Sequence, residues 1–286
     1  MVYGVLRMIN FAHGDVFMAG SFGAYILATH LAADGVTASS PMLAILAIVL
    51  GGSATSAVIA AFVERFAYRP FRHQRTLAPL ICAIGVSFIL QYSVRGLFGT
   101  GSRGYPDIAW LDGELSLGFI AAPKAQLFVI VAAVLAMILL HLVVSRTRVG
   151  KAMRAVAEDR DTAALMGIDS GRIIAITFLM GGAMAGAAGV LYALVFKQIH
   201  AFMGFFLGIK GFAAAVLGGI GNIPGAMVGG FIMGLVEGLG PAGLLDGFGI
   251  PAPYQLRDAI SYAMLVMVLI FLPRGLFGER LAVKRM

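Results

Sequence analysis

Met8–Gly23, MINFAHGDVFMAGSFG, joins a polar segment directly to an apolar run that contains several glycines. Its polar side chains are Asn10, His13 and Asp15, and the run that follows, Val16–Ala33, has no charged residue. In water such a sequence would form an unusual loop. In a membrane, polar groups beside a break in a glycine-rich helix are typical of a segment that lines a path.

A looser copy of this pattern lies near the other end of the chain. It is Gly218–Gly234, GGIGNIPGAMVGGFIMG, in which Asn222 and Pro224 interrupt an otherwise uncharged stretch. A helix rich in small residues is again predicted after the break. We therefore expect two broken helices, one near each end of the sequence.

The composition is that of a membrane protein. Hydrophobic residues make up 60% of the chain, charged residues 12%, and the mean hydropathy is +0.93, whereas soluble domains have roughly 45–50% apolar and ~25% charged residues. Most of the uncharged runs approach the ~20 residues that a helix needs to cross the hydrocarbon core. We predict an all-α polytopic transmembrane bundle of about 7–8 membrane segments, with broken or re-entrant helices. The runs are Val16–Ala33, Gly35–Val63, Thr76–Val94, Ala125–Ser145, Ile173–Phe196, Gly211–Val236 and Ala259–Pro273.

Charge placement argues against a nucleic-acid partner and predicts the topology. The net charge is +7, but the basic residues lie in short segments between the runs, which is the signal of membrane orientation. We expect three basic segments in the cytoplasm: Glu64–Thr76, Arg146–Arg172, and the tail after Pro273 with Arg274, Arg280, Lys284 and Arg285. We expect the less basic segments outside: Asp34, Arg95–Lys124, Lys197–Lys210 and Glu237–Asp258.

This alternation constrains Gly208–Val236. A single crossing there would deliver the basic tail to the outside, so the stretch is predicted to enter and return on the same side. Asn222–Pro224 is the expected reversal, since proline lacks a donor N–H and disfavours helix at Ile223. A re-entrant loop and two short crossings are both open.

The outer loop, residues 95–124, is rich in turn residues. Short strands are predicted around Asp107–Trp110 and Glu114–Ile120, and Tyr105 and Trp110 suit an interfacial position. The loop is either a plain tether between spans or a docking surface for an external partner.

The tentative substrate path consists of polar residues and glycines at the two breaks. For Asn10 and Asp15, N-capping and path lining are equally good interpretations, whereas capping does not call for a histidine at His13. Helix N-termini at such breaks suit an anionic group such as a carboxylate. The second break contributes Gly218, Gly219, Asn222 and Pro224.

The cytoplasmic loop, residues 146–172, is predicted to contain two short helices. Lys151–Glu158 forms the first, and Asp161 caps a second, Thr162–Met166, which Gly167 ends. This pair forms either a docking knob or a helix on the lipid headgroups. The acidic residues of the loop argue against the second arrangement, because an anionic lipid surface would repel them.

Four motifs in order resemble one transporter family. INFAHGDVFMAG, GKAMRAVAEDRDTAALMGID, AAVLGGIGNIPGAMVGG and FLPRGLFGE are similar to those of the LivH-type inner-membrane permeases of bacterial branched-chain amino acid ABC importers. The resemblance covers nearly the whole chain. It implies a single permease domain, residues 1–286, in the bacterial inner membrane, with a cytoplasmic C-terminus and no cofactor.

The resemblance also implies partners. They are ATP-binding cassette ATPase subunits, a second permease subunit (identical or homologous), an external substrate-binding protein and the lipid bilayer. ATPase contacts would fall in the cytoplasmic loop on Arg154, Glu158, Asp159, Ala163, Ala164 and Gly167. Family members carry roughly 20–30 further residues before MVYGVLRMINFAHGD, most of a first helix, so we expect Met1 to be a misassigned start or the start of a fragment.

Other functions are less well supported. The five histidines are scattered without metal-ligand spacing, and no Walker A loop is present, so ATP hydrolysis is expected on a separate chain. One alternative is a urea or short-chain amide permease of the same superfamily. Another is a passive channel with paired half-helices, and a third is an intramembrane enzyme that uses His13 and Asp15.

Overall fold

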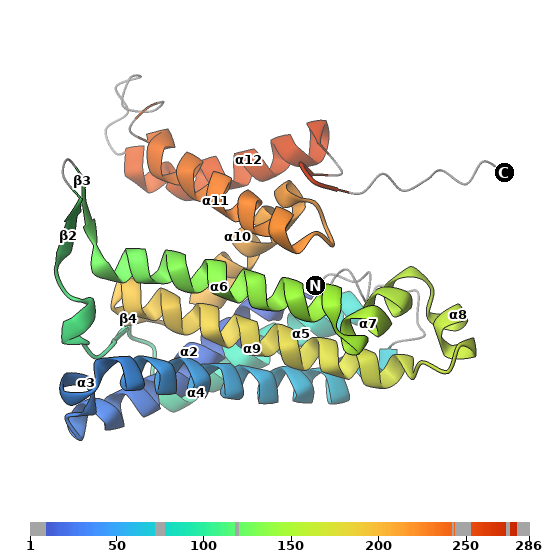
Figure 1. Ribbon diagram of the computed structural model, residues 1–286, viewed down its shortest axis with the longest axis horizontal. Helices are drawn as coiled ribbons and strands as arrows, with labels where there is room; N and C mark the ends of the chain where they lie inside the picture. Colours follow the sequence, from blue (N-terminus) through green and yellow to red (C-terminus); the bar gives the residue numbers. More distant parts are fainter. Residues whose placement is uncertain are drawn as a thin grey trace. The chain divides into compact units, whose positions relative to one another are not determined.

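The computed structural model describes residues 10–71, 78–117, 120–241, 243, 253–272 and 275–278. The chain forms two compact units, of which the first ends at Gly208 and the second begins at Ile209 (Figure 1). Each is described by itself, as the N-terminal and the C-terminal unit. The segment before Asn10 and the basic residues of the tail, from Arg274 to Arg285, lie outside the described residues.

The N-terminal unit is built from long apolar helices. They are α2 (His13–Ala33), α4 (Pro41–Phe62), α5 (Ala78–Phe98), α6 (Lys124–Arg146) and α9 (Ser170–Phe196). α2, α4 and α9 pack against one another, α5 packs on α2, and α6 packs on α9. Shorter elements join them: α3 (Val36–Ser39), η1 (Val63–Tyr68) and η2 (Arg69–Phe71).

Glycines let α2, α4 and α9 approach until their backbones touch. A Cβ on Gly186 of α9 would overlap the carbonyl oxygen of Gly52 on α4, and one on Gly20 of α2 would overlap the Ser56 hydroxyl. Such small residues are typical of helix contacts in lipid, where apolar burial between helices gives no net driving force and close packing has to stabilise the bundle. The glycines therefore fix which faces meet.

Six helices in the described part of the chain are long and apolar enough to cross a membrane. They are α2, α4 with its extension to Phe71, α5, α6, α9 and α11 (Ile223–Gly240). This confirms the predicted all-α polytopic bundle. Apolar side chains cover the outside of α6, whose most apolar 18-residue window has no buried residue, as expected of a helix that faces lipid.

Short strands and short helices lie at opposite ends of the N-terminal unit (Figure 1). β1 (Arg103–Gly104) pairs with β4 (Gln198–Ile199), and β2 (Glu114–Leu117) with β3 (Ile120–Pro123). The other end carries α7 (Arg148–Glu158) and α8 (Arg160–Leu165). Segments that the charge pattern assigns to the same side of the membrane therefore lie at the same end of the unit. Which side each end faces stays a prediction.

One of the two predicted outer strands is wrong. Glu114–Leu117 is a strand as expected, but the segment predicted as a strand around Asp107–Trp110 instead leads into the 3-10 turn η3 (Ala109–Leu111). Ile108 and Leu111 are both buried in the core, and a 3-10 turn places residues three apart on the same side. Burial of this pair outweighs the local strand preference.

The C-terminal unit is a helical hairpin with a third helix. α10 (Met203–Gly218), which begins in the N-terminal unit, is followed by α11, η6 (Pro253–Leu256) and α12 (Arg257–Phe271). A Cβ on Gly218 would overlap the Gly225 backbone, and one on Gly229 the Ala214 carbonyl oxygen. The predicted return of the chain is thus present, at Gly219–Asn222.

The prediction that Pro224 breaks the helix at Ile223 is wrong. α11 begins at Ile223 with Asn222 as its N-cap, so that Pro224 lies in the first turn. Proline is tolerated there because the first N–H groups of a helix have no partner within it. Positive φ angles at Gly219 and Gly221, 104° and 98°, make the reversal instead.

The C-terminal segment contacts α10 at two places, one near the start of α12 and one beyond its end. Near the start of α12, Asp258 lies 2.7 Å from Lys210 of α10. Beyond its end, the N–H groups of Leu276 and Phe277 bond to the last carbonyls of α10, next to the turn. The C-terminal segment therefore contacts α10 both at Lys210 and at its last turn.

We expect Gly186→Ala to destabilise the protein and Gly85→Ala not to. The added methyl group at Gly186 overlaps Gly52, and overpacking costs about 1–3 kcal/mol. At Gly85 of α5 a Cβ meets no described atom within 4 Å, and alanine in a helix adds up to about 1 kcal/mol of stability. Thermal unfolding in detergent should show opposite shifts. Equal shifts would contradict the role assigned to close backbone contact.

Candidate functional site

Asp15 forms a buried hydrogen-bonded cluster between α2 and α5. Its side chain is fully buried. The Ser87 hydroxyl donates to one carboxylate oxygen, and Gln91 Nε2 donates to the other at 3.0 Å and to Ser87 Oγ at 3.1 Å. Ser87 and Gln91 lie four residues apart on the same face of α5, so both donors reach one acceptor group. Each carboxylate oxygen of Asp15 thus accepts one hydrogen bond from α5.

Asn10 and Asp15 do not cap α2. The N-cap position is Ala12, without a side-chain hydrogen bond, and Asp15 lies inside the first turn. Asn10 Oδ1 instead accepts from the Tyr68 hydroxyl at 2.8 Å, and His13 is half-buried as the first helical residue. The capping interpretation of Asn10 and Asp15 is therefore wrong.

Sequence reasoning missed the partners of these residues. Ser87, Gln91 and Tyr68 were not candidates, nor was Ser56, whose hydroxyl donates to the Val16 carbonyl oxygen at 2.8 Å. A signal did exist for Gln91. It is a strongly polar side chain inside an apolar run, and such residues are functional candidates by default.

The second half of the predicted path lies in the C-terminal unit. Asn222 Oδ1 accepts from the Gly225 N–H at 2.9 Å, and Gly218 and Gly219 are buried at the turn. Pro224 follows in the first turn of α11. Gly218, Gly219, Asn222 and Pro224 thus lie together at the turn, and Asn10, His13 and Asp15 belong to the other unit. Their shared role in a path stays a prediction.

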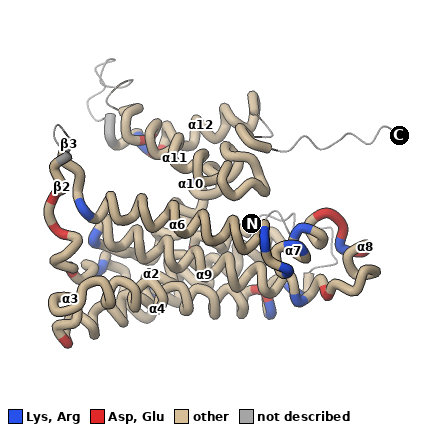
Figure 2. Tube along the Cα trace, in the orientation of Figure 1, with Lys and Arg blue, Asp and Glu red and all other residues tan. Residues whose placement is uncertain are grey.

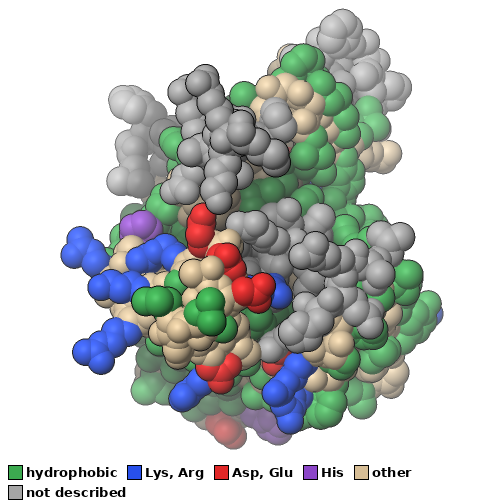
Figure 3. All heavy atoms as spheres, turned by 90° about the vertical axis from the view of Figure 1, so that its right-hand side faces the viewer, with side chains coloured by type: hydrophobic (Ala, Val, Ile, Leu, Met, Phe, Trp, Pro, Cys, Tyr) green, Lys and Arg blue, Asp and Glu red, His purple; other side chains and the backbone are tan. Residues whose placement is uncertain are grey.

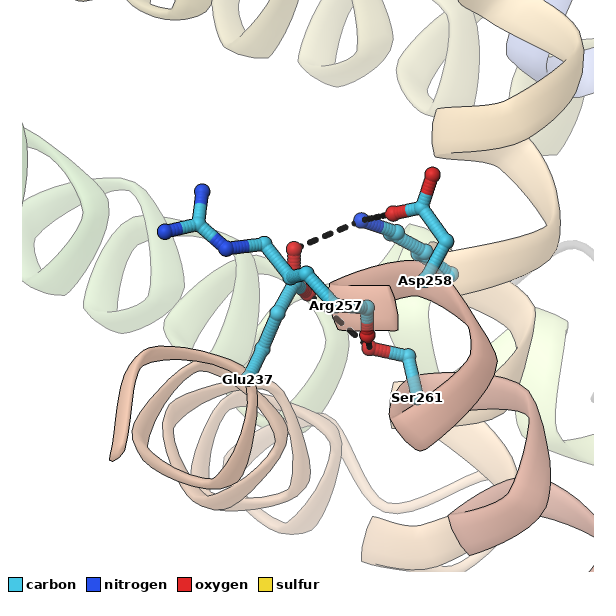
Figure 4. A network of polar contacts seen from close by, with 5 residues as sticks. Glu237, Arg257, Asp258 and Ser261 are labelled. Atoms are coloured by element: carbon cyan, nitrogen blue, oxygen red, sulfur yellow. Dashed lines mark hydrogen bonds and ion pairs between the residues drawn. The ribbon is translucent and has the colours of Figure 1, made fainter. Parts of the chain in front are cut away.

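A charged network joins α10, α11 and α12 of the C-terminal unit on the side away from the hairpin turn (Figure 4). Lys210 Nζ lies 2.7 Å from a carboxylate oxygen of Glu237 and 2.7 Å from one of Asp258. The Ser261 hydroxyl donates to the second oxygen of Glu237 at 3.0 Å. Lys210 and Glu237 are largely buried, with side chains 19% and 20% exposed, so loss of either would leave a poorly solvated charge.

The outer loop is anchored to the end of α9 and is not a free tether. Lys197 ends α9 in the left-handed conformation, with φ 55°, and its ammonium group pairs with Asp107 and, at 2.6 Å, with Asp112. The hydrogen bonds to Asp107 and then Asp112 raise the pKa of Lys197. The Tyr105 N–H also donates to the Lys197 carbonyl oxygen at 2.9 Å.

The two aromatic residues of this loop differ in their surroundings. Trp110 is 46% exposed and packs edge-on against Phe128, which fits the interfacial position predicted for it. Tyr105 is 5% exposed and packs beside Tyr25 in the core. The ring of Tyr105 therefore lies inside the bundle, and the interfacial position of both residues stays a prediction.

The cytoplasmic loop folds into two capped helices, α7 and α8. The Thr147 hydroxyl oxygen caps α7 by accepting from the Gly150 N–H. Asp159, rather than the predicted Asp161, caps α8, because its carboxylate accepts from the N–H groups of Asp161 and Thr162. Gly167 ends the second helix as predicted, with φ 80°.

The residues of this loop divide into an inner and an outer set. Ala163 is 4% exposed and holds α8 on the unit together with the buried Met153 and Val156 of α7. The sequence-based site missed Leu165 and Met166, whose exposed fractions are 87% and 79%. The remaining predicted contacts are exposed: Arg154, Glu158, Asp159, Ala164 and Gly167.

This end of the N-terminal unit combines apolar and charged groups. Lys and Arg residues gather around α7, with Asp and Glu between α7 and α8, while α6 and α9 are uncharged along most of their length (Figure 2). Hydrophobic side chains lie at the surface among the charged ones (Figure 3). Large exposed apolar groups within a polar rim are typical of a protein interface. Among the described residues, no group of three or more His, Cys, Asp or Glu could hold a metal ion.

Comparison with known proteins agrees with a membrane bundle. The family described as "Branched-chain amino acid transport system / permease component" matches residues 1–269. The chain belongs to this permease family. It is a membrane-spanning transport permease and not an enzyme, as the motifs predicted.

Named relatives of the permease cover nearly its whole length. The high-affinity branched-chain amino acid transport system permease protein BraD of Pseudomonas aeruginosa is 42% identical over 98% of this chain and 89% of its own. LivH of Escherichia coli K12, described in the same words, is 38% identical over 98% and 88%. The probable LivH of Methanocaldococcus jannaschii is 29% identical over 97% and 85%. No solved structure matches.

We expect Asp15 and Gln91 to be energetically coupled. Asp15→Asn and Gln91→Leu should each destabilise the permease, because each leaves a buried polar group without its partner, at a cost of about 1–3 kcal/mol. The double variant should cost less than the sum, by about 0.5–3 kcal/mol. Unfolding in detergent measures this cycle. Ser93→Ala, at an exposed position of the same helix, is the control, and its effect on stability should be additive with that of Asp15→Asn. If the effects of Gln91→Leu and Asp15→Asn were also additive, the cluster would be contradicted.

Proposed function

We propose that this permease is the membrane subunit of an importer that moves branched-chain or similar small amino acids into the cytoplasm, driven by ATP hydrolysis on separate subunits. Family membership carries the proposal, because the relatives are named as branched-chain amino acid transport permeases. A second permease subunit and an external binding protein complete the proposed assembly. Its C-terminus is proposed to be cytoplasmic.

The exposed end formed by α7 and α8 is the proposed contact with the ATPase. Leu165 and Met166 would enter an apolar pocket of the partner, and Arg154, Glu158 and Asp159 would form the polar rim. Ala163 is buried, so it supports the contact from beneath. Capping by Thr147 and Asp159 keeps the pair of helices folded before the partner binds, which lowers the ordering cost of association.

The outer loop is the proposed contact with the binding protein. Lys197, Asp107 and Asp112 hold this loop on the bundle, so Trp110 and Leu115 are presented at fixed, partly exposed positions. An anchored surface of this kind can transmit docking to α9, whereas a loose tether could not.

The proposed substrate path runs along α2 and the hairpin turn. Asn10, His13 and Asp15 contribute from α2, and Gly218, Gly219, Asn222 and Pro224 from the turn. The carboxylate of Asp15 accepts hydrogen bonds from Ser87 and Gln91 in this structure. We therefore assign it to a seam between α2 and α5 that opens when polar groups of water or substrate replace these bonds.

We expect uptake of leucine, isoleucine or valine into proteoliposomes only when the permease is reconstituted with its ATPase, second permease and binding-protein partners and ATP is supplied. The chain has no ATP-binding loop of its own, so the partners must provide the driving force. Radiolabelled amino acid measures uptake, and urea and acetamide are the competing substrates. Conduction by the purified chain alone, without ATP, would support a passive channel and contradict the proposal.

We expect Leu165→Ser combined with Met166→Ser to lower ATPase binding and uptake at least about tenfold. The reason is that burial of each large apolar side chain at an interface contributes roughly 1.5–3 kcal/mol. Co-purification with the ATPase subunit measures binding, at equal amounts of permease in the membrane. Leu115→Ser, on the outer hairpin and 46% exposed, is the matched control for ATPase binding alone and should bind the ATPase normally. Its uptake is not compared, because Leu115 lies in the proposed contact with the binding protein. Wild-type binding by the double variant would place the contact elsewhere.

A further inference from the structure

The last carbonyl groups of α10 find their partners in a segment far along the chain. A helix leaves its final carbonyls without partners in the helix itself. Here the Leu276 N–H donates to the Leu217 carbonyl oxygen at 2.7 Å, and the Phe277 N–H to the Gly218 carbonyl oxygen at 3.1 Å. Gly275–Gly278 thus lies against the end of α10 and satisfies its last carbonyl groups.

Asn222 connects the same segment to α11 through both ends of its amide. Its Oδ1 caps α11 by accepting from Gly225, and its Nδ2 donates to the Phe277 carbonyl oxygen at 3.2 Å. One side chain therefore links the hairpin turn, the start of α11 and the segment after α12.

Two glycines allow this contact, and side-chain packing contributes little to it. Gly275 has φ 70°, and a Cβ there would overlap the Val216 carbonyl oxygen. Gly219 has φ 104°, and a Cβ there would lie 2.5 Å from the Gly278 nitrogen. By contrast, Leu276 and Phe277 are 45% and 50% exposed. The segment is held by its backbone.

We propose that Gly275–Gly278 is a backbone strap that fixes the end of α10 and the Gly219–Asn222 turn in one conformation. Strap and turn then move as one body, and any change in the turn has to carry the strap with it. The inference concerns contacts within the C-terminal unit, so it holds or fails independently of the transported substrate.

Hydrogen exchange on the full chain in lipid nanodiscs tests the strap directly. In the wild type, the amides of Leu276 and Phe277 should exchange at least about tenfold more slowly than in an unstructured peptide, because both are hydrogen-bonded. Exchange of both amides at the unstructured rate would overturn the proposal.

Two variants separate the strap from general stability. Asn222→Asp keeps the acceptor that caps α11 but replaces the donor to Phe277 by an oxygen, so both strap amides should exchange at least about tenfold faster while α11 stays protected. Gly275→Ala should have the same effect on the strap. Gly35→Ala is the matched control, because Gly35 has φ 71° but no described atom within 4 Å of its Cβ position.

The control reports the effect of alanine at a left-handed glycine outside the strap. Gly35→Ala should leave the strap amides unchanged. If Gly275→Ala and Asn222→Asp also leave them at the wild-type rate, the strap is not held as proposed. Protection of α9 amides, measured in the same samples, shows whether each variant is folded, so loss of protection in the strap alone supports the proposal.

Discussion

Direct backbone contact between helices is the interaction on which the N-terminal unit depends. Gly20, Gly52 and Gly186 bring α2, α4 and α9 together with no side chain between them. In lipid, burial of larger apolar side chains between helices would give little net stabilisation, so close packing and hydrogen bonds have to supply it. The hydroxyl of Ser56 uses the same proximity to reach the Val16 carbonyl oxygen, and the approach of the backbones therefore also places the polar groups.

In the C-terminal unit, direct backbone contact stabilises one end of the hairpin and ion pairs stabilise the other. At the turn, Gly218 and Gly225 let the backbones of α10 and α11 touch, and backbone hydrogen bonds satisfy the helix end. At the other end, Lys210, Glu237 and Asp258 hold the helices by ion pairs. Backbone contact is rigid and depends on glycine, whereas ion pairs tolerate small displacements. The two ends of one hairpin are thus stabilised by contacts of different stiffness.

Most helices could be predicted because run length and charge are local properties of the sequence. Several errors share a cause, since the partner that decides the structure lies far along the chain. Asp15 precedes an apolar run as a cap would, but Ser87 and Gln91 lie more than 70 residues away. The error at Pro224 is local instead, because proline fits the first turn of the helix that begins at Ile223. Family motifs indicated the cytoplasmic loop, yet the exposure of Leu165 and Met166 depended on how α8 packs.

The contacts of α2 with its neighbouring helices differ in whether a water molecule or a ligand could replace them. Where α2 meets α4 and α9, close backbone contacts at glycines dominate beside the hydrogen bond from Ser56 to Val16, and no water molecule or ligand can substitute for those backbone contacts without a gap. Where α2 meets α5, hydrogen bonds from Ser87 and Gln91 to Asp15 contribute, and any polar molecule can exchange for them at small net cost. Separation of α5 from α2 is therefore cheaper in the presence of a polar solute than separation of α4 or α9.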